Sequence, residues 1–94
     1  SIVLKNRANG SMAEVPLSAV FVAIGLVPDN KIYEGVLKLD ERGYIDSGED
    51  CLTDCKGVFV AGDTRNKTLR QLVTAASDGA TAATAAANYI RKNF

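Results

Sequence analysis

A short apolar run that ends in a carboxylate, followed by a long helical pattern, constrains the fold of this chain most. Residues 58–63 read VFVAGD, so a strand-like run stops at Gly62 and Asp63. After a polar loop, alanine and larger apolar residues recur at helical spacing from Leu72 to Ile90. A strand, a loop and a packed helix in this order predict an α/β unit with Asp63 at the carboxyl end of the strand.

The helix is expected to begin near Leu69. Thr68 and Gln71 have the spacing of a capping box, with Thr68 as the N-cap residue. Arg91 and Lys92 fall in the expected last turn, where cations complement the helix dipole. The packed face is mostly Ala and Gly, which lets the helix backbone lie close to a sheet or to a flat ligand.

The remaining apolar runs predict strands of two kinds. Residues 2–6 and 12–17 flank an Asn-Gly pair, the pattern of a tight hairpin. Residues 36–45, with a glycine in the turn, predict a second small hairpin. Residues 19–25 read AVFVAIG and are continuously apolar, as in a strand that is covered on both faces. Pro28 and the two turn-forming residues after it end that strand and mark where the chain passes from one unit to another.

Composition excludes several classes of function. With 94 residues there is room for one small domain. The 11 basic and 11 acidic residues balance, so no basic patch speaks for nucleic acid. No apolar run approaches the roughly 20 residues needed to cross a membrane, and we expect a cytoplasmic location. The chain has no histidine, which excludes histidine catalysis and histidine metal ligation. It opens in a strand pattern without a methionine, so we expect a fragment or a processed product.

Cys51 and Cys55 are spaced C-x-x-x-C, one residue more than the redox spacing C-x-x-C. No other cysteine or histidine can complete a metal site with them. The simplest interpretation is two half-buried thiols near a strand. A local disulfide or a redox role is the alternative.

The Gly-Asp pair and the helix after it suit a ligand with two different ends. An ionised Asp63 only accepts hydrogen bonds, and the hydroxyls of a sugar or polyol are natural donors. A helix amino end favours an anion or an electron-rich carbonyl. Flavin presents both, as a ribityl chain and a pyrimidine edge. The alternative is that Asp63 only caps a turn and the helix only packs on a sheet.

Four segments, VFVAIGLVPDN, LDERGYI, GVFVAGDTRNKTLRQLVTAASDGATAA and NYI, resemble in order the C-terminal part of bacterial-type, low-molecular-weight thioredoxin reductase. That family is an FAD- and NADPH-dependent homodimer that passes electrons through a C-x-x-C disulfide to thioredoxin. The resemblance implies an α/β fold that is part of a Rossmann-like, FAD/NAD(P)-binding flavoprotein. Residues 1–27 would be the tail of the NADPH-binding segment, and residues 28–94 the C-terminal part of the FAD domain.

The resemblance also implies site residues. The aspartate would hold the ribityl hydroxyls, and the Arg-Gln pair would lie at the helix start beside the flavin ring. The glutamine and the leucine after it would contribute backbone N–H groups, and an alanine would lie one helical turn further on. The implied cofactor-binding residues are Gly62, Asp63, Arg70, Gln71, Leu72 and Ala75.

The chain lacks the G-x-G-x-x-G phosphate loops and the C-x-x-C dithiol of the resembled family. We therefore expect it to bind FAD weakly by itself, to be inactive with NADPH, and to self-associate through its uncovered apolar strand. Two alternatives remain open. One is a related flavoprotein, of the ferredoxin–NADP reductase or alkyl hydroperoxide reductase type. The other is a non-enzymatic, self-associating fragment.

Overall fold

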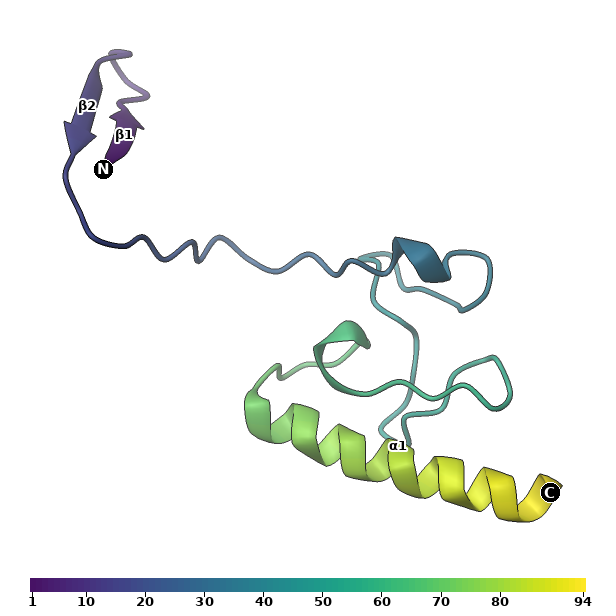
Figure 1. Ribbon diagram of the computed structural model, residues 1–94. Helices are drawn as coiled ribbons and strands as arrows, with labels where there is room; N and C mark the ends of the chain where they lie inside the picture. The colour runs from purple at the N-terminus through teal and green to yellow at the C-terminus, as the bar shows by residue number, and fades with distance from the viewer.

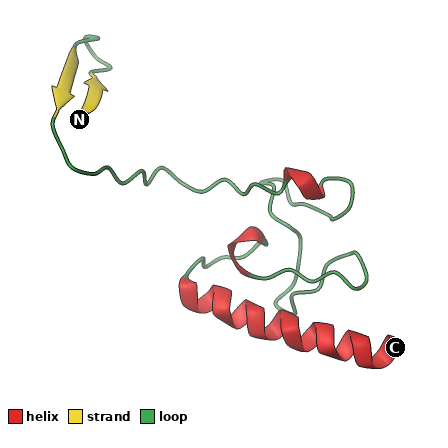
Figure 2. Cartoon of the chain, in the orientation of Figure 1, coloured by secondary structure: helices red, strands yellow, loops and turns green.

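The computed structural model describes all residues 1–94. Two strands, β1 (Ile2–Lys5) and β2 (Met12–Val15), come first, and a long helix, α1 (Leu72–Asn93), comes last. Between them lie two single 3-10 turns, η1 (Lys31–Tyr33) and η2 (Gly62–Thr64). Figure 1 shows this order along the chain, and Figure 2 shows that most of the connecting chain is loop. The predicted α/β class, with a hairpin and one long C-terminal helix, is confirmed.

The N-terminal hairpin is confirmed, but its turn is wider than predicted. β1 and β2 pair antiparallel, with Ile2 opposite Val15. The loop is closed by the N–H of Asn6, which donates to the carbonyl of Ser11 at 2.8 Å. Only Gly10 of the Asn-Gly pair has a positive φ, +73°, whereas a two-residue type I′ turn needs two. The tight turn was therefore wrong, and a six-residue loop takes its place.

The predicted strand at residues 19–25 is absent. The segment is extended, yet it pairs with no other strand and lies in open solvent between the hairpin and the rest of the chain (Figure 1). Phe21 is 95% exposed and Ile24 is 92% exposed. A strand needs a neighbour to satisfy its N–H and C=O groups, and no part of this chain reaches residues 19–25. The apolar pattern is present, but no other segment of this chain covers it.

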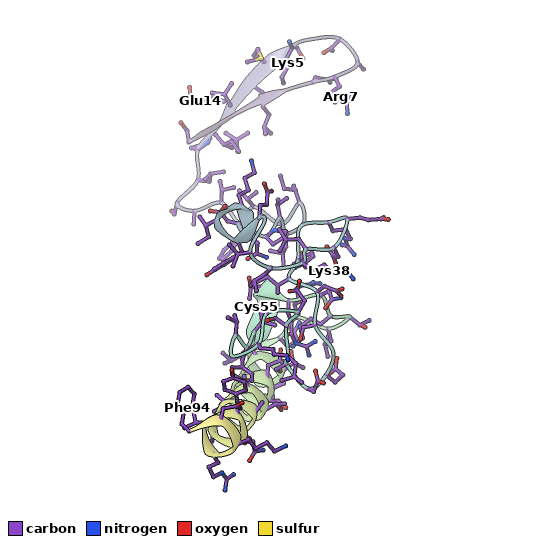
Figure 3. All side chains as sticks on the ribbon, turned by 90° about the vertical axis from the view of Figure 1, so that its right-hand side faces the viewer. Lys5, Arg7, Glu14, Lys38, Cys55 and Phe94 are labelled. Carbon is purple, nitrogen blue, oxygen red and sulfur yellow. The ribbon has the colours of Figure 1, made fainter.

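The hairpin stands apart from the packed part of the molecule. Figure 3 shows Lys5, Arg7 and Glu14 well away from the unit that carries Cys55 and α1. The molecule extends 65 × 28 × 20 Å, with a radius of gyration of 19.7 Å. A compact chain of this length would have a radius of gyration of about 13 Å. Only residues 30–94 form a packed unit.

The second hairpin, predicted over residues 36–45, is present. Leu39 pairs antiparallel with Ile45, and the turn contains Gly43 at φ +83°. Ile45 pairs on its other side, in parallel, with Arg65. This third segment brings the chain that follows η2 alongside the hairpin, and so fixes the Gly-Asp turn to it.

A small apolar cluster forms the centre of the unit. Leu37, Ile45 and Val60 are each less than 10% exposed and pack together. The predicted strand at residues 58–61 is reduced to one antiparallel bridge, between Leu52 and Phe59. The segment is still buried at Val60, as its apolar pattern indicated.

Helix α1 begins three residues later than predicted. Its N-cap residue is Gln71, not Thr68. The N–H of Gln71 donates to the hydroxyl of Thr74 at 3.1 Å, so Thr74 satisfies the helix start from inside the first turn. The expected capping box at Thr68 was therefore wrong. The two cations predicted for the last turn are there.

Only part of the predicted apolar stripe of α1 is covered. Ala75 and Tyr89 are half-buried, and the ring of Tyr89 meets Phe59 edge to face, with 6.1 Å between the ring centroids. Leu72 is 90% exposed. The one fully buried residue of the helix is charged, Asp78. No helix of the chain, α1 included, has the length and apolar character that a membrane crossing requires.

Candidate functional site at the Gly-Asp turn

The Gly-Asp pair forms η2, which packs on the first two turns of α1. A Cβ atom placed on Gly62 would lie 3.7 Å from the Cβ of Ala75, an ordinary contact. The φ of Gly62 is +82°, a conformation that side chains rarely adopt. The backbone angle, rather than a lack of room, requires glycine here. It brings the turn down onto the helix.

A buried ion cluster ties η2 to α1. One carboxylate oxygen of Asp78, Oδ2, accepts from the N–H of Gly62 at 3.0 Å, from Nε of Arg65 at 2.8 Å and from Nζ of Lys67 at 2.7 Å. Its Oδ1 accepts from Nη2 of Arg65 at 3.0 Å. Glu49 reaches the same guanidinium from the solvent side at 3.2 Å. All the donors come from the turn or from the loop directly after it.

The carboxylate of Asp78 stays ionised. Hydrogen bonding from Arg65 holds the pKa of the Asp78 carboxyl well below its usual range, and Lys67 and the N–H of Gly62 act in the same direction. Burial opposes this effect but does not outweigh it. The pKa of Arg65 is raised in turn, chiefly by its hydrogen bonds to Asp78. The turn is therefore anchored by a full negative charge.

A second anchor holds the other end of η2. The side-chain amide of Asn30, which is 4% exposed, donates to the carbonyls of Gly43 and Thr64 at 2.9 Å each. The hydroxyl of Thr64 donates back to Oδ1 of Asn30. This one amide joins the end of the extended segment, the second hairpin and the Gly-Asp turn.

Of the two side chains in the turn, that of Thr64 is held by Asn30, whereas the carboxylate of Asp63 is held by no other residue. Its backbone carbonyl accepts from Nε of Arg70 at 3.3 Å, whereas its exposed side chain has no hydrogen bond or ion pair within the chain. Asp63 and Arg70 line a cavity of about 280 Å³, together with residues 26–30, Tyr44 and Thr64. An acceptor with no partner lies at the edge of this open space.

Arg70 forms one wall of that cavity. Its guanidinium lies 3.8 Å from the ring centroid of Tyr44, a close cation–π contact. Its Nη2 also donates to the carbonyl of Arg65 at 3.2 Å. These contacts fix the guanidinium in place without a carboxylate partner.

The amino end of α1 is open. The N–H of Gln71 is used by Thr74, whereas the N–H groups of Leu72 and Val73 have no acceptor in the chain. Unpaired N–H groups at a helix start carry a partial positive charge. The site therefore combines a free carboxylate with an electropositive helix end.

The family model of the pyridine nucleotide-disulphide oxidoreductases matches residues 3–80. The chain belongs to the pyridine nucleotide-disulphide oxidoreductase family. Thioredoxin reductases of Peptoclostridium litorale and Peptoclostridium acidaminophilum are 45% and 42% identical to it over 100% of the chain. The crystal structure of Lactococcus lactis thioredoxin reductase, in its FR conformation, matches 96% of the chain with a TM-score of 0.74 at 33% identity. That of the Streptococcus pyogenes thioredoxin reductase has a TM-score of 0.78 at 29% identity.

The chain spans about a third of these relatives. It covers 32% of each of the two Peptoclostridium proteins, and 30% and 29% of the two solved structures. The resemblance to thioredoxin reductase that the sequence motifs indicated is confirmed. It extends over nearly the whole of the chain.

The structure brings most of the expected site residues of this oxidoreductase chain together. Gly62 contacts Ala75, Arg70 binds the backbone of Asp63, and Gln71 and Leu72 form the tip of the helix. Sequence reasoning missed three residues that hold them: Asn30, Arg65 and Asp78. A signal existed for one of them, because Asp78 lies three residues after Ala75 on the packed face. A charge on a packed face must be paired.

The two thiols of this family member are free. Cys51 is fully buried, and its Sγ lies 3.5 Å from the backbone carbonyl of Asp78. Burial is the main reason why its pKa is raised, so its thiol is a poor nucleophile. Cys55 is half-buried against the apolar cluster. Of the two thiols predicted to be half-buried, Cys55 is so, whereas Cys51 is fully buried, and the chain contains no disulfide.

Proposed function

We propose that this chain forms the ribityl and isoalloxazine side of the FAD site in an NADPH-dependent thioredoxin-disulfide reductase. In this proposal residues 28–94 belong to the FAD domain, and residues 1–27 are the tail of the NADPH-binding segment. The observation that carries it is the Asp63 carboxylate. This carboxylate has no partner within the chain. The turn that carries it is held by hydrogen bonds to Asp78, Arg70 and Asn30, and it lies beside the open amino end of α1.

The donors and acceptors of the site fit a flavin. The carboxylate of Asp63 would accept hydrogen bonds from ribityl hydroxyls. The N–H groups of Leu72 and Val73 would face the electron-rich pyrimidine edge, and Arg70 would fix the wall of the cavity beside Asp63. Bound FAD would accept a hydride from NADPH and pass electrons to a disulfide. The residues of this chain would bind and orient the cofactor.

The relatives support a partner for the whole protein, and the cysteines support a cellular setting. Proteins called thioredoxin reductase match the whole chain, which supports thioredoxin as the electron acceptor. Two free thiols, one of them fully buried, suit the reducing conditions of the cytoplasm. Phe21 and Ile24 lie on a bare apolar segment, which supports assembly with further protein surface, either the rest of the reductase or the second subunit of a dimer.

The proposal is tested on the protein encoded by the complete reading frame that contains residues 1–94. Because Asp63 has no partner within the chain, Asp63→Asn should leave the melting temperature of the apoprotein unchanged. Lost hydrogen bonds to a charged group should weaken FAD binding about 10- to 100-fold. The dissociation constant is measured by the change of flavin fluorescence on binding, and NADPH-dependent reduction of thioredoxin is assayed beside it.

Asp54→Asn is the matched control. Asp54 is an exposed carboxylate that accepts from the N–H of Lys38 at 3.1 Å and does not line the cavity. It should bind FAD as the wild type does. FAD affinity that is equal in the wild type and Asp63→Asn would overturn the proposed function.

A further inference from the structure

We propose that Asp78 is a positioning residue of the flavin site: its carboxylate sets where η2 presents Asp63 relative to the amino end of α1. This inference rests on the proposed function. It assigns a role to a residue that need not touch the cofactor.

The hydrogen bonds of the Asp78 carboxylate are confined to the chain around Asp63. It binds the residue before Asp63, through the N–H of Gly62, and two residues shortly after it, Arg65 and Lys67. It is not a member of the apolar cluster of Leu37, Ile45 and Val60. The anchor is therefore local to the turn, while the centre of the unit is built by other residues.

The turn has no other link of this strength to the helix that carries the open amino end. Asn30 ties η2 to the second hairpin, and Arg70 ties it to the loop before α1. Asp78 lies within α1 itself, two turns from its start. A change in its hydrogen bonds would move the Asp63 carboxylate relative to the N–H groups of Leu72 and Val73, between which a flavin would have to fit.

The charge of Asp78 is essential to this geometry. Its Oδ2 accepts three donors at 3.0 Å or less, two of them cationic. An asparagine would place its NH₂ group against Arg65 or Lys67, whose side chains are 1% and 5% exposed, and would leave those cations without a full countercharge. Even with its amide oxygen in the place of Oδ2, its NH₂ group would face Nη2 of Arg65, and a neutral oxygen would bind both cations more weakly.

A double-mutant cycle on the protein of the complete reading frame tests the inference. Asp78→Asn is expected to weaken FAD binding by about tenfold. If Asp78 acts through Asp63, the double variant Asp63→Asn/Asp78→Asn should bind FAD within about twofold of Asp63→Asn alone. Dissociation constants come from flavin fluorescence, and the melting temperature of each apoprotein is measured alongside. Losses that multiply, or an Asp78→Asn variant that binds like the wild type, would overturn the inference.

The cycle separates this inference from the proposed function. Unchanged FAD affinity in Asp63→Asn would contradict the proposed function. If the losses of FAD affinity of the two single variants multiply in the double variant, only the role of Asp78 is contradicted. Lys38→Met is the matched control, because it removes the cation of an exposed ion pair, with Asp46 at 2.7 Å, and keeps all the bonds of Asp78. It should bind FAD within about threefold of the wild type, since an exposed ion pair contributes little.

If Asp78→Asn does not fold, hydrogen exchange of the wild-type protein tests the role of Asp78 instead. The N–H of Gly62 should exchange with solvent slowly, at least about 100-fold below the rate of a free amide. Its protection should be the same with and without FAD, because the turn is already held. A Gly62 amide that is unprotected in the apoprotein, or protected only when FAD binds, would overturn the inference.

Discussion

Residues 1–29 expose most of their large apolar side chains, whereas residues 30–94 bury several of theirs. The first region contains the longest apolar run of the chain, yet Phe21, Ile24 and Val27 are each more than 90% exposed. The second has shorter and more scattered apolar residues, and it buries Leu37 and Ile45 almost completely. The two regions are alike in residue type and differ in neighbours, since only the second contains segments that fold back on one another (Figure 1).

An apolar pattern indicates that a segment needs to be covered, but the cover must come from neighbouring segments. Residues 19–25 need cover on two faces, and this chain supplies none. Around Ile45, by contrast, the chain provides a strand partner on each side, Leu39 and Arg65. Hydrophobic stabilisation follows the area removed from water, so the exposed run contributes almost nothing to stability within these residues.

The largest expected effect is a difference in the loss of stability when an isoleucine of each region is replaced by alanine. Ile45→Ala should lower the free energy of unfolding by about 2–5 kcal/mol, because it leaves a cavity in the apolar cluster. The matched change Ile24→Ala should cost less than about 0.5 kcal/mol, since the side chain has no neighbours to lose. Urea denaturation followed by the fluorescence of the tyrosines measures both. Equal losses would mean that residues 19–25 are covered in solution, by a second copy or otherwise.

The second expected effect is a pH dependence of stability that comes from the ion cluster of the packed unit. The folded-state pKa of Asp78 lies below that of the unfolded chain, so its ionised form stabilises the unit at every pH above about 4. This contribution is lost as the pH falls from there toward the folded-state pKa. Circular dichroism of the tyrosines between pH 7 and pH 2 should show acid unfolding of the unit.

The matched variant for the acid experiment is Asp78→Asn. It should be less stable at pH 7 and lose little further stability on acidification, because the group that titrates is gone. The hairpin of β1 and β2 contains no buried carboxylate and should not follow the transition. Identical acid midpoints for the wild type and Asp78→Asn would contradict the assignment.

The smallest expected effects come from two glycines with open space around them. Gly10 and Gly79 both have nothing within 4 Å of an added Cβ, but only Gly10 has a positive φ. Gly79→Ala should stabilise α1 by about 0.5–1 kcal/mol, from helix propensity alone. Gly10→Ala should cost about 1 kcal/mol, enough to melt a lone two-stranded hairpin.

Thermal unfolding measures the change in the helix. The cross-strand contact between Val3 and Glu14, followed by NMR, measures the change in the hairpin. A Gly79→Ala variant that is less stable than the wild type would show that α1 packs closely against another surface in solution.

Local patterns predicted the elements whose partners lie nearby in the sequence. The hairpins at residues 2–15 and 36–45 and the helix at the C-terminus follow from turn residues and periodicity. The start of α1 was missed by three residues, because Thr74 supplies a hydroxyl from within the helix and replaces the expected cap at Thr68. Several residues were competent to cap, and the sequence does not rank them.

The exposed residues of the candidate site were predicted from the sequence. The buried residues that hold them in place were not. Asp63 was found as a carboxylate after a strand-like run, and Arg70 came from the resemblance. Arg65 and Asp78 were not found, because their meeting depends on how η2 lies across α1. Asn30 was read as a turn former, whereas it is a buried amide that bridges three segments.

The sequence by itself determined the order of elements, the Gly-Asp turn, the family and the lack of histidine chemistry, because each of these depends on residue types and short spacings. Only the tertiary structure decided which apolar residues are covered, and that a single carboxylate on α1 holds the turn while the carboxylate of Asp63 stays free. Burial and ion pairing depend on which distant segments meet. Thirteen residues separate Arg65 from Asp78, and only the packing of turn on helix brings their charges within 2.8 Å.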